Sequence, residues 1–332
     1  MKVGILYSEK EVDNELEHRI NPHGSIQMDV TLESIKNALE NRGHETILIP
    51  AVINLPTKLR ELSDLDIIFN LSTGITKKSQ QAHVVSILEM MSIPFLGSGL
   101  SSQVLSLEKH VAKKIFDYEG IPTPKFQVFY TGEEKLREDL NFPLILKPVH
   151  EGSSMGITED SIVTDEESLK IRVSEIISDF KQAAMVEEFI VGREFTVGIM
   201  GNDKLEVLPI EEIVFDHRDT KKLGVMTLDI KTRDAIVPKT PADIPKEKAE
   251  EIVTYAKKIF RVLGCRDFAR IDLRMDNQGV PYFLEVNALP GLQPEYSEFP
   301  RMAAAAGYMY DELVEKLMFI ALDRYKTKNK YI

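Results

Sequence analysis

The chain of 332 residues contains a single cysteine, Cys265, so an internal disulfide is excluded. Cys265 lies in a Leu-Gly-Cys segment between a predicted helix and a predicted strand, with no histidine close to it in the sequence. A small apolar side chain in this setting is typical of a buried core position and not of a reactive thiol. The sequence therefore favours neither a disulfide-stapled scaffold nor a cysteine nucleophile.

Positive charge is also scarce, with 41 Lys and Arg against 53 Asp and Glu and a net charge of −12. This net negative charge argues against non-specific nucleic-acid binding. It does not exclude local basic pockets that bind phosphates. No apolar run reaches the length of a membrane span, and the apolar residues 1–7 are too short for a signal peptide. We therefore expect a cytoplasmic protein without nucleic-acid or membrane partners.

Two common functional signatures are missing as well. The first predicted strand, residues 2–7, is followed by a turn that lacks the glycines needed for pyrophosphate binding, so a dinucleotide-binding dehydrogenase is rejected. The seven histidines are scattered without metal-ligand spacing. Of these, only His217, in a predicted loop, remains a candidate.

What is present is an ordinary enzyme composition, 43% apolar and 28% charged, with length enough for two or three domains. Short apolar strands are predicted at residues 2–7, 46–49 and 66–71. Between and after them, helices are predicted around residues 32–39, ending at Gly43, and at residues 79–91. This alternation predicts a parallel βαβ layer at the N-terminus.

Further along the chain, residues 216–241 are polar and without a clear period, which predicts a long functional loop. Residues 247–263 predict an amphipathic helix. A closing helix is predicted at residues 308–325, with Leu313, Leu317 and Ile320 turned inward.

A predicted hairpin near the C-terminus carries the most informative polar residues. Residues 268–275 alternate as a strand does, residues 276–279 are Asp-Asn-Gln-Gly, and residues 280–286 form a second apolar strand. Antiparallel pairing of these strands brings Asp272 towards Glu285.

Asn287 follows Glu285 by two positions, so both side chains point to one face of the strand, where Asp272 can join them. Oxygen ligands of this kind suit Mg²⁺ or Mn²⁺, and Mg²⁺ usually shares its shell with phosphate oxygens. A phosphorylated ligand is therefore implied. The residue types alone leave open, with equal weight, a solvated hairpin with ordinary surface acids.

A second phosphate signal lies in the middle of the chain. Residues 142–148 predict an apolar strand that carries Lys147 near its end, and the loop Glu-Gly-Ser-Ser-Met-Gly follows at residues 151–156. Small residues let backbone N–H groups approach phosphate oxygens, and Ser153 and Ser154 add hydroxyl donors. A plain Gly/Ser turn is the alternative; Lys147 upstream and the acidic hairpin downstream favour the phosphate loop.

The segments Ala269-Arg-Ile-Asp272, Leu284-Glu-Val-Asn287 and Pro290-Gly291 together resemble the signature of the ATP-grasp superfamily. Among its members, the chain is most similar to the D-alanine–D-alanine ligase family over nearly its whole length. This resemblance implies a three-domain α/β fold, with an N-terminal domain at residues 1–100, a central ATP-grasp lid domain at 101–194 and a C-terminal domain with the metal site at 195–332. It also implies a homodimer.

The resemblance implies a nucleotide site with ATP as the cosubstrate. Its implied members are Lys109, Lys147, Ser153, Met155, Glu187, Glu188, Phe189, Ile190, Glu194 and Leu284. By resemblance, Glu187 accepts from the adenine amino group, and backbone groups of Phe189 and Ile190 pair with the ring. Glu194 would bind the ribose, while Lys109 and Lys147 would contact the phosphates. Lys109 could instead be a solvated helix lysine, and the glutamates exposed strand residues.

The family joins two amino acids through an acyl phosphate, which assigns catalytic roles by resemblance. Arg270 and the backbone N–H of Gly291 are implied as donors to the oxyanion of the tetrahedral intermediate. Ser154 and Lys221 are implied catalytic residues of the phosphate loop and the substrate-covering loop. Asp272, Glu285 and Asn287 are the implied metal ligands.

The substrate site departs from the family pattern. In the N-terminal loop only Glu11 is a weak candidate for binding the first substrate, and the Lys-Tyr pair of the covering loop is replaced by Lys221-Lys222. Where the family has a serine that holds the second substrate, this chain has Tyr296 with Ser297 beside it. We therefore expect a different acceptor: another amino acid, a larger amine or a short peptide.

Three other functions stay open. The first is a genuine D-alanine–D-alanine ligase of cell-wall synthesis. The second is a small-molecule kinase, because kinases and ligases share the same phosphate clamp. The third, a non-catalytic ATP-binding regulator, is disfavoured because the implied metal ligands, both lysines and Arg270 are all present.

Overall fold

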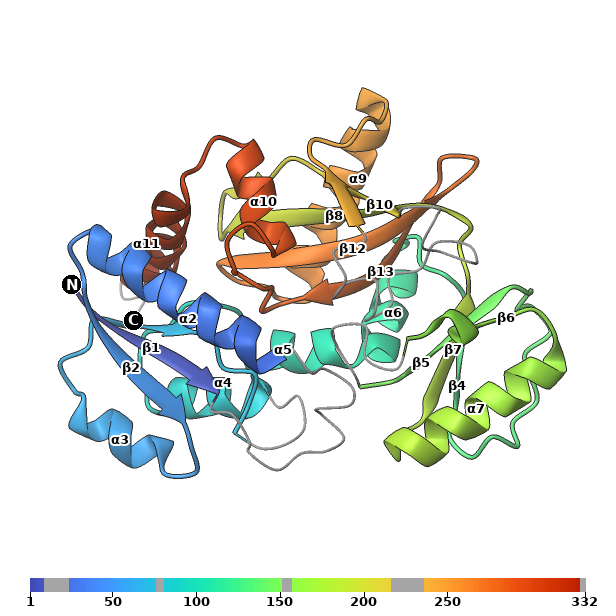
Figure 1. Cartoon of the computed structure of the whole chain (residues 1–332), viewed down its shortest axis with the longest axis horizontal. Helices are drawn as coiled ribbons and strands as arrows, with labels where there is room; N and C mark the ends of the chain where they lie inside the picture. The colour runs from blue at the N-terminus through green and yellow to red at the C-terminus, as the bar shows by residue number, and fades with distance from the viewer. Residues whose placement is uncertain (9–23, 76–80, 151–156, 216–235, 329–332) are drawn as a thin grey trace.

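The computed structural model describes residues 1–8, 24–75, 81–150, 157–215 and 236–328. Three sheets with helices packed on them form a mixed α/β molecule, as expected from the sequence. In Figure 1 the first sheet lies at the left, the second at the lower right, and the third spans the upper part between them. None of the helices in these ranges is long and apolar enough to cross a membrane.

The first sheet is the predicted parallel layer. Strand β1 (Lys2–Ser8) lies between β2 (Glu45–Ala51) and β3 (Ile67–Asn70), and both neighbours run parallel to it. Helix α2 (Gly24–Asn41) crosses over between β1 and β2. The turn after α2 contains Gly43 at φ 80°, a left-handed conformation that glycine adopts without steric cost. The remaining helices here are α3 (Leu55–Glu61) and α4 (Gln81–Met90).

The second sheet is antiparallel with strand order β4-β7-β5-β6. Its strands are β4 (Phe126–Phe129), β5 (Leu144–Pro148), β6 (Ile162–Val163) and β7 (Ala184–Glu188). Helix α7 (Glu166–Phe180) covers one face, and its N-terminus is capped by the Asp165 side chain, which accepts from the Ser168 N–H. The short 3-10 helix η1 (Glu159–Ser161) precedes β6, and helices α5 (Leu100–Leu107) and α6 (Lys109–Tyr118) lead into this sheet.

The third sheet has the order β11-β10-β8-β12-β13, with β9 paired to β8. Its strands are β8 (Gly192–Gly201), β9 (Leu205–Val207), β10 (Glu211–Phe215), β11 (Ile236–Lys239), β12 (Phe268–Asp276) and β13 (Pro281–Asn287). Helix α9 (Lys246–Val262) packs against β8. The prediction of a loop at residues 216–241 was wrong at the C-terminal end of this range, because β11 pairs antiparallel with β10 there.

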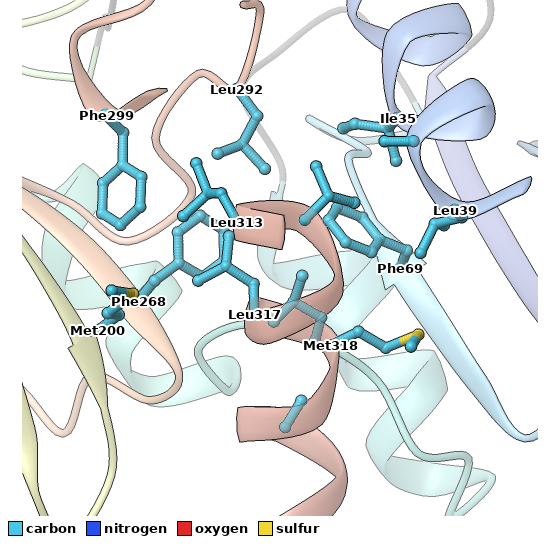
Figure 2. Close-up of a cluster of buried hydrophobic side chains, with 14 of the residues drawn as sticks. Ile35, Leu39, Phe69, Met200, Phe268, Leu292, Phe299, Leu313, Leu317 and Met318 are labelled. Atoms are coloured by element: carbon cyan, nitrogen blue, oxygen red, sulfur yellow. The ribbon is translucent and has the colours of Figure 1, made fainter. Parts of the chain in front are cut away.

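A continuous core joins the first and third sheets through the C-terminal helices α10 (Glu298–Ala305) and α11 (Tyr310–Lys328). Figure 2 shows Ile35 and Phe69 from the first layer on one side and Phe268 of β12 on the other, with Leu317 of α11 between them. Leu313 and Leu317 are buried as predicted, and Ile320 is partly buried at the edge of this core. Helix α11 therefore fixes the N-terminal layer to the sheet that carries the acidic hairpin.

Candidate active site

The β12–β13 hairpin brings together the two acidic residues that the sequence predicts to meet. Asp272 pairs with Glu285, and Arg270 pairs with Asn287. Ile271 and Val286 point into the core on the opposite face, so the four polar side chains share the other face of the sheet. The hairpin thus gathers three oxygen-bearing side chains and one guanidinium at the end of two paired strands.

A β-bulge sets the direction of Glu285. The register shifts between Asp272 and Leu273, so that Leu273 pairs with Phe283 and Leu284 has no partner on β12. Phe283 is in the core, and strict alternation would then send Glu285 into the core as well. The extra residue in β13 shifts the alternation of side chains between the two faces of the sheet by one position. Leu284 and Glu285 are therefore both only partly buried.

The carboxylate of Asp272 is held by four donors. Arg270 Nε and Nη2 donate to its two oxygens at 2.9 and 2.8 Å. Thr196 Oγ1 donates at 2.6 Å and Asn287 Nδ2 at 2.9 Å. Asn287 can rotate its amide so that its oxygen replaces its nitrogen, which would release one acceptor position on Asp272.

The oxygen donors Asp272, Glu285 and Asn287 fit a hard cation that also binds phosphate oxygens. Two carboxylates leave most of the coordination shell to other ligands. Within the described ranges, no group of three or more His, Cys, Asp or Glu side chains is placed to hold a metal. The chemistry of the trio would suit an open Mg²⁺ site better than a closed protein cage.

Arg270 is clamped from two sides. Its Nη1 donates to Glu298 Oε2 at 2.8 Å, in addition to the two bonds to Asp272. Burial alone would lower the pKa of this guanidinium, but Asp272 and Glu298 outweigh burial and raise it. Arg270 is therefore a permanently charged and firmly oriented donor, as an oxyanion site requires.

Both predicted phosphate lysines are buried against carboxylates. Lys109 is the first residue of α6, and its Nζ lies 3.5 Å from Glu285 Oε2. Lys147, on β5, lies 2.6 Å from Glu187 Oε1 on β7. Burial would raise the pKa of Glu285, but the charges of Lys109, Lys147 and Arg270 lower it. The site thus alternates cations and anions across the second and third sheets.

Glu187 has a second cationic neighbour that sequence reasoning missed. Lys113 of α6 is fully buried, and its Nζ lies 3.0 Å from Glu187 Oε2. Burial raises the pKa of Glu187, but Lys113 and Lys147 outweigh it and lower the pKa to about 2. Although Lys113 is close, Glu187 Oε2 is a buried atom with no hydrogen-bond partner of acceptable geometry within the described residues.

The segment after β7 is braced by Arg274, another residue that sequence reasoning missed. Arg274 donates to Ile190 O at 2.8 Å, to Gly192 O at 2.9 Å and to Glu194 Oε2 at 2.7 Å. Its guanidinium also stacks over the Phe189 ring, 4.7 Å from the centroid. The signal was present in the sequence, because Arg274 continues the alternation of Arg270 and Asp272 along β12.

Not all of the predicted nucleotide-binding residues in this segment face the site. The Phe189 N–H already donates to Pro143 O at 2.9 Å, and the Glu188 carboxylate accepts from the Asn141 amide groups at 3.3 Å. Glu194 is on β8, where burial raises its pKa despite Arg274. The structure thus brings Glu187 and Glu194 towards the site, while the Glu188 side chain turns to Asn141.

The predicted acceptor loop follows β13 directly. Ser297 Oγ accepts from the Gln293 N–H at 3.2 Å, and a Cβ added to Gly291 would meet that Oγ at 2.7 Å, so glycine is needed for this approach. Arg301 donates to the Tyr296 carbonyl and pairs with the buried Glu211. Ser297 is buried and Tyr296 is partly exposed.

Five predicted site residues lie outside the described ranges, and so does the candidate His217. They are Glu11, Ser153, Ser154, Met155 and Lys221. Cys265 is buried as predicted, and burial raises the pKa of its thiol to about 12, which keeps it protonated.

Comparison with known proteins gives matches over most of the chain. A family model described as D-ala D-ala ligase C-terminus matches residues 115–319. The uncharacterized protein y4sG of Sinorhizobium fredii is 34% identical over 302 residues, 88% of each chain. A D-alanine–D-alanine ligase of Pelotomaculum thermopropionicum is 31% identical over 338 residues, 97% of each chain. The crystal structure of a D-alanine–D-alanine ligase from Bacillus anthracis complexed with ATP has the same fold, with a TM-score of 0.75, 24% identity and 99% of both chains covered.

Proposed function

This chain belongs to the D-alanine–D-alanine ligase family of ATP-grasp enzymes, and on that premise we propose that it joins a carboxylate to an amine other than D-alanine. As a member it is an ATP-dependent carbon–nitrogen ligase. The reaction uses ATP and a divalent metal, Mg²⁺ or Mn²⁺, and small amino-acid substrates. The choice of acceptor is our own inference.

The observation that supports ATP-dependent ligation is the alternation of positive and negative charge around the hairpin. Lys109 and Lys147 lie against Glu285 and Glu187, and Arg270 lies against Asp272. Two lysines held by carboxylates are poised to exchange those contacts for triphosphate oxygens. A Mg²⁺ ion bound by Asp272, Glu285 and Asn287 would neutralise the charge that develops during phosphoryl transfer.

Three steps follow for the protein's own groups. Lys109 and Lys147 orient the triphosphate while a substrate carboxylate oxygen attacks the γ-phosphorus and ADP leaves. The amine then attacks the acyl carbon, and Arg270 with the Gly291 N–H stabilises the oxyanion of the tetrahedral intermediate. Collapse of that intermediate expels phosphate, the amine loses its proton, and the amide remains. One such oxyanion donor contributes about 3–4 kcal/mol.

The nucleotide role of the segment after β7 is supported by three of its polar groups. Glu187 Oε2 is buried beside Lys113 and has no hydrogen-bond partner of acceptable geometry among the described residues, which suits the amino group of adenine. Because the Phe189 N–H and the Ile190 carbonyl already have partners, we assign the ring contacts to the Ile190 N–H and the Phe189 carbonyl. We assign the ribose to Glu194 and a contact with the base to Leu284.

The proposal of a different acceptor rests on the loop after Gly291. Ser297 is buried and already accepts the Gln293 N–H, while the adjacent residue in the chain is the bulky and partly exposed Tyr296. A site built for particular polar groups rejects substrates that lack them by large factors, so these replacements alter the acceptor more than the ATP chemistry. We therefore propose another amino acid, a larger amine or a short peptide as the acceptor in place of D-alanine.

We further propose the three domains 1–100, 101–194 and 195–332, each built around one of the three sheets. A homodimer and a cytoplasmic location stay predictions from the family.

A screen of phosphate release over pairs of amino acids and small amines tests the proposed function. The ligase hypothesis predicts ADP, phosphate and an amide in equal amounts when both substrates are present. A stable phosphorylated product with no free phosphate would instead identify a small-molecule kinase, which shares the same phosphate clamp. Tight ATP binding with no turnover on any pair would favour the non-catalytic regulator.

A further inference from the structure

Lys113 is a fully buried lysine that points at the nucleotide site from α6. Its Nζ donates to Thr123 Oγ1 at 2.6 Å and lies 3.0 Å from Glu187 Oε2. The ammonium also lies 5.7 Å from the centroid of the Phe126 ring. A charged group removed from water to this extent is retained only where partners compensate it, and here the anionic partner is Glu187.

Glu187 is therefore divided between two cations on different elements. The Nζ of Lys147, on β5, lies 2.6 Å from Glu187 Oε1, and the Nζ of Lys113, on α6, faces Glu187 Oε2. With only Lys147 present, the carboxylate could turn both oxygens to that one ammonium, as carboxylates do with a single cationic partner. The positive charge of Lys113, 3.0 Å from Oε2, disfavours this rotation.

The position of Lys113 is itself fixed by the strand that carries Glu285. Thr123 Oγ1 donates to Phe283 O at 2.8 Å, and the Phe283 N–H donates to Pro122 O at 2.8 Å. The segment between α6 and β4 is thus fastened to β13, two residues before Glu285. Strand β13 therefore holds both Lys113, at the nucleobase end of the site, and Glu285, at the metal end.

We propose that Lys113 is a positioning residue that sets nucleobase selectivity: it holds Glu187 Oε2 ready for the amino group of a 6-aminopurine, so that adenine nucleotides bind better than 6-oxopurine nucleotides. The proposal rests on the proposed function, because it takes Glu187 as the group that meets the base. A 6-oxopurine presents an acceptor oxygen to the same carboxylate oxygen, and two acceptors repel each other.

The test compares binding of ADP and IDP by isothermal titration calorimetry in the full-length protein, without any acceptor. The unmodified protein is expected to prefer ADP. Lys113→Met keeps the length and removes the charge, and it is expected to reduce the ADP-to-IDP preference by roughly tenfold or more. Lys114→Met is the matched control, because its side chain is the exposed neighbour on the same helix, and it is expected to leave the preference unchanged.

A second readout uses pH. Burial lowers the pKa of Lys113 to about 8, against the raising effect of Glu187. The other charged groups that face it keep their charge near that pH, since the pKa of Lys147 is raised and those of Glu187 and Glu285 are lowered. The preference for ADP should therefore fall as pH rises through about 8 in the unmodified protein. Lys113→Arg, which stays charged, should keep it.

The outcomes separate the two proposals. Equal weakening of ADP and IDP in a folded Lys113→Met protein would overturn the role of Lys113 while leaving the ligase intact. Equal binding of ADP and IDP by the unmodified protein would do the same. If Lys113→Met does not fold, Thr123→Val, which removes the hydroxyl that anchors Lys113, must reduce the preference or the proposal is wrong. No binding of ADP at all by the unmodified protein would overturn the proposed function itself.

Discussion

At the scale of single residues, the site is a set of buried charges that neutralise one another. Arg270 is held by Asp272 and Glu298, Lys109 faces Glu285, and Lys147 faces Glu187. Such pairs contribute little net stability because desolvation offsets their attraction. Their arrangement instead keeps groups charged and oriented where a triphosphate would bind.

Glu285→Gln tests the metal assignment. The variant removes one charge from a site that would be crowded by triphosphate oxygens, and it keeps the shape of the side chain. Turnover should fall by more than the roughly 10- to 100-fold loss typical of a residue that only supports a metal ligand. The measurement is Mg²⁺-dependent ADP formation, with the exposed Glu61→Gln as control. Normal ADP formation in Glu285→Gln would remove this residue from the metal site.

Lys147→Ala tests the phosphate clamp. A lysine that only faced phosphate would affect affinity alone, but Lys147 is buried and paired with Glu187. We therefore expect weaker ATP binding together with a loss of stability. The loss should stay below the roughly 3–5 kcal/mol typical of an uncompensated buried charge, because Lys113 still neutralises Glu187. Calorimetric ATP affinity and a urea melt are the measurements, and an unchanged ATP dissociation constant would contradict the assignment.

At the scale of elements, the period of two along β12 and β13 predicted the pairing of Asp272 with Glu285. The bulge at Leu284 was not predictable, because the residue that is left unpaired depends on the neighbouring strand and not on the local sequence. Lys113 was missed for a related reason: a lysine in an amphipathic helix is usually solvated, and only the packing of α6 against β13 buries it. Strand β11 was missed because its pairing partner, β10, is separated from it by residues 216–235.

Helix α11 is fastened to the third sheet by a buried ion pair, which gives a prediction about stability. Arg324 donates to both oxygens of the fully buried Asp267 at 2.9 and 2.7 Å, and Asp267 also accepts from the Gly97 N–H at 2.8 Å. Arg324→Met leaves that carboxylate without its counter-charge and should lower the free energy of unfolding by about 3 kcal/mol.

A chemical denaturation curve measures this loss. The exposed Lys326→Met on the same helix is the control and should change stability by less than about 0.5 kcal/mol. Equal midpoints for the two variants would show that the ion pair does not secure α11.

At the scale of the whole molecule, the sequence predicted the parallel N-terminal layer, the acidic hairpin and the closing helix, since each depends on a local hydrophobic period. The way α11 bridges the first and third sheets could not be read from any single segment, because that core combines residues from both ends of the chain (Figure 2). This core also packs Leu292 and Phe299, at the two ends of the predicted acceptor loop, together with Phe268 of the hairpin strand β12.

The acceptor is the central claim, and a product assay with the unmodified enzyme tests it most directly. The enzyme is incubated with ATP and Mg²⁺, with D-alanine alone or with D-alanine plus a panel of larger amino acids, amines and short peptides, and the products are identified by mass spectrometry. We predict that one of the larger acceptors gives an amide in equal amount to the ADP and phosphate formed, with D-alanine alone giving little. Efficient synthesis of D-alanyl-D-alanine as the preferred reaction would contradict the claim and assign the ordinary function of the family.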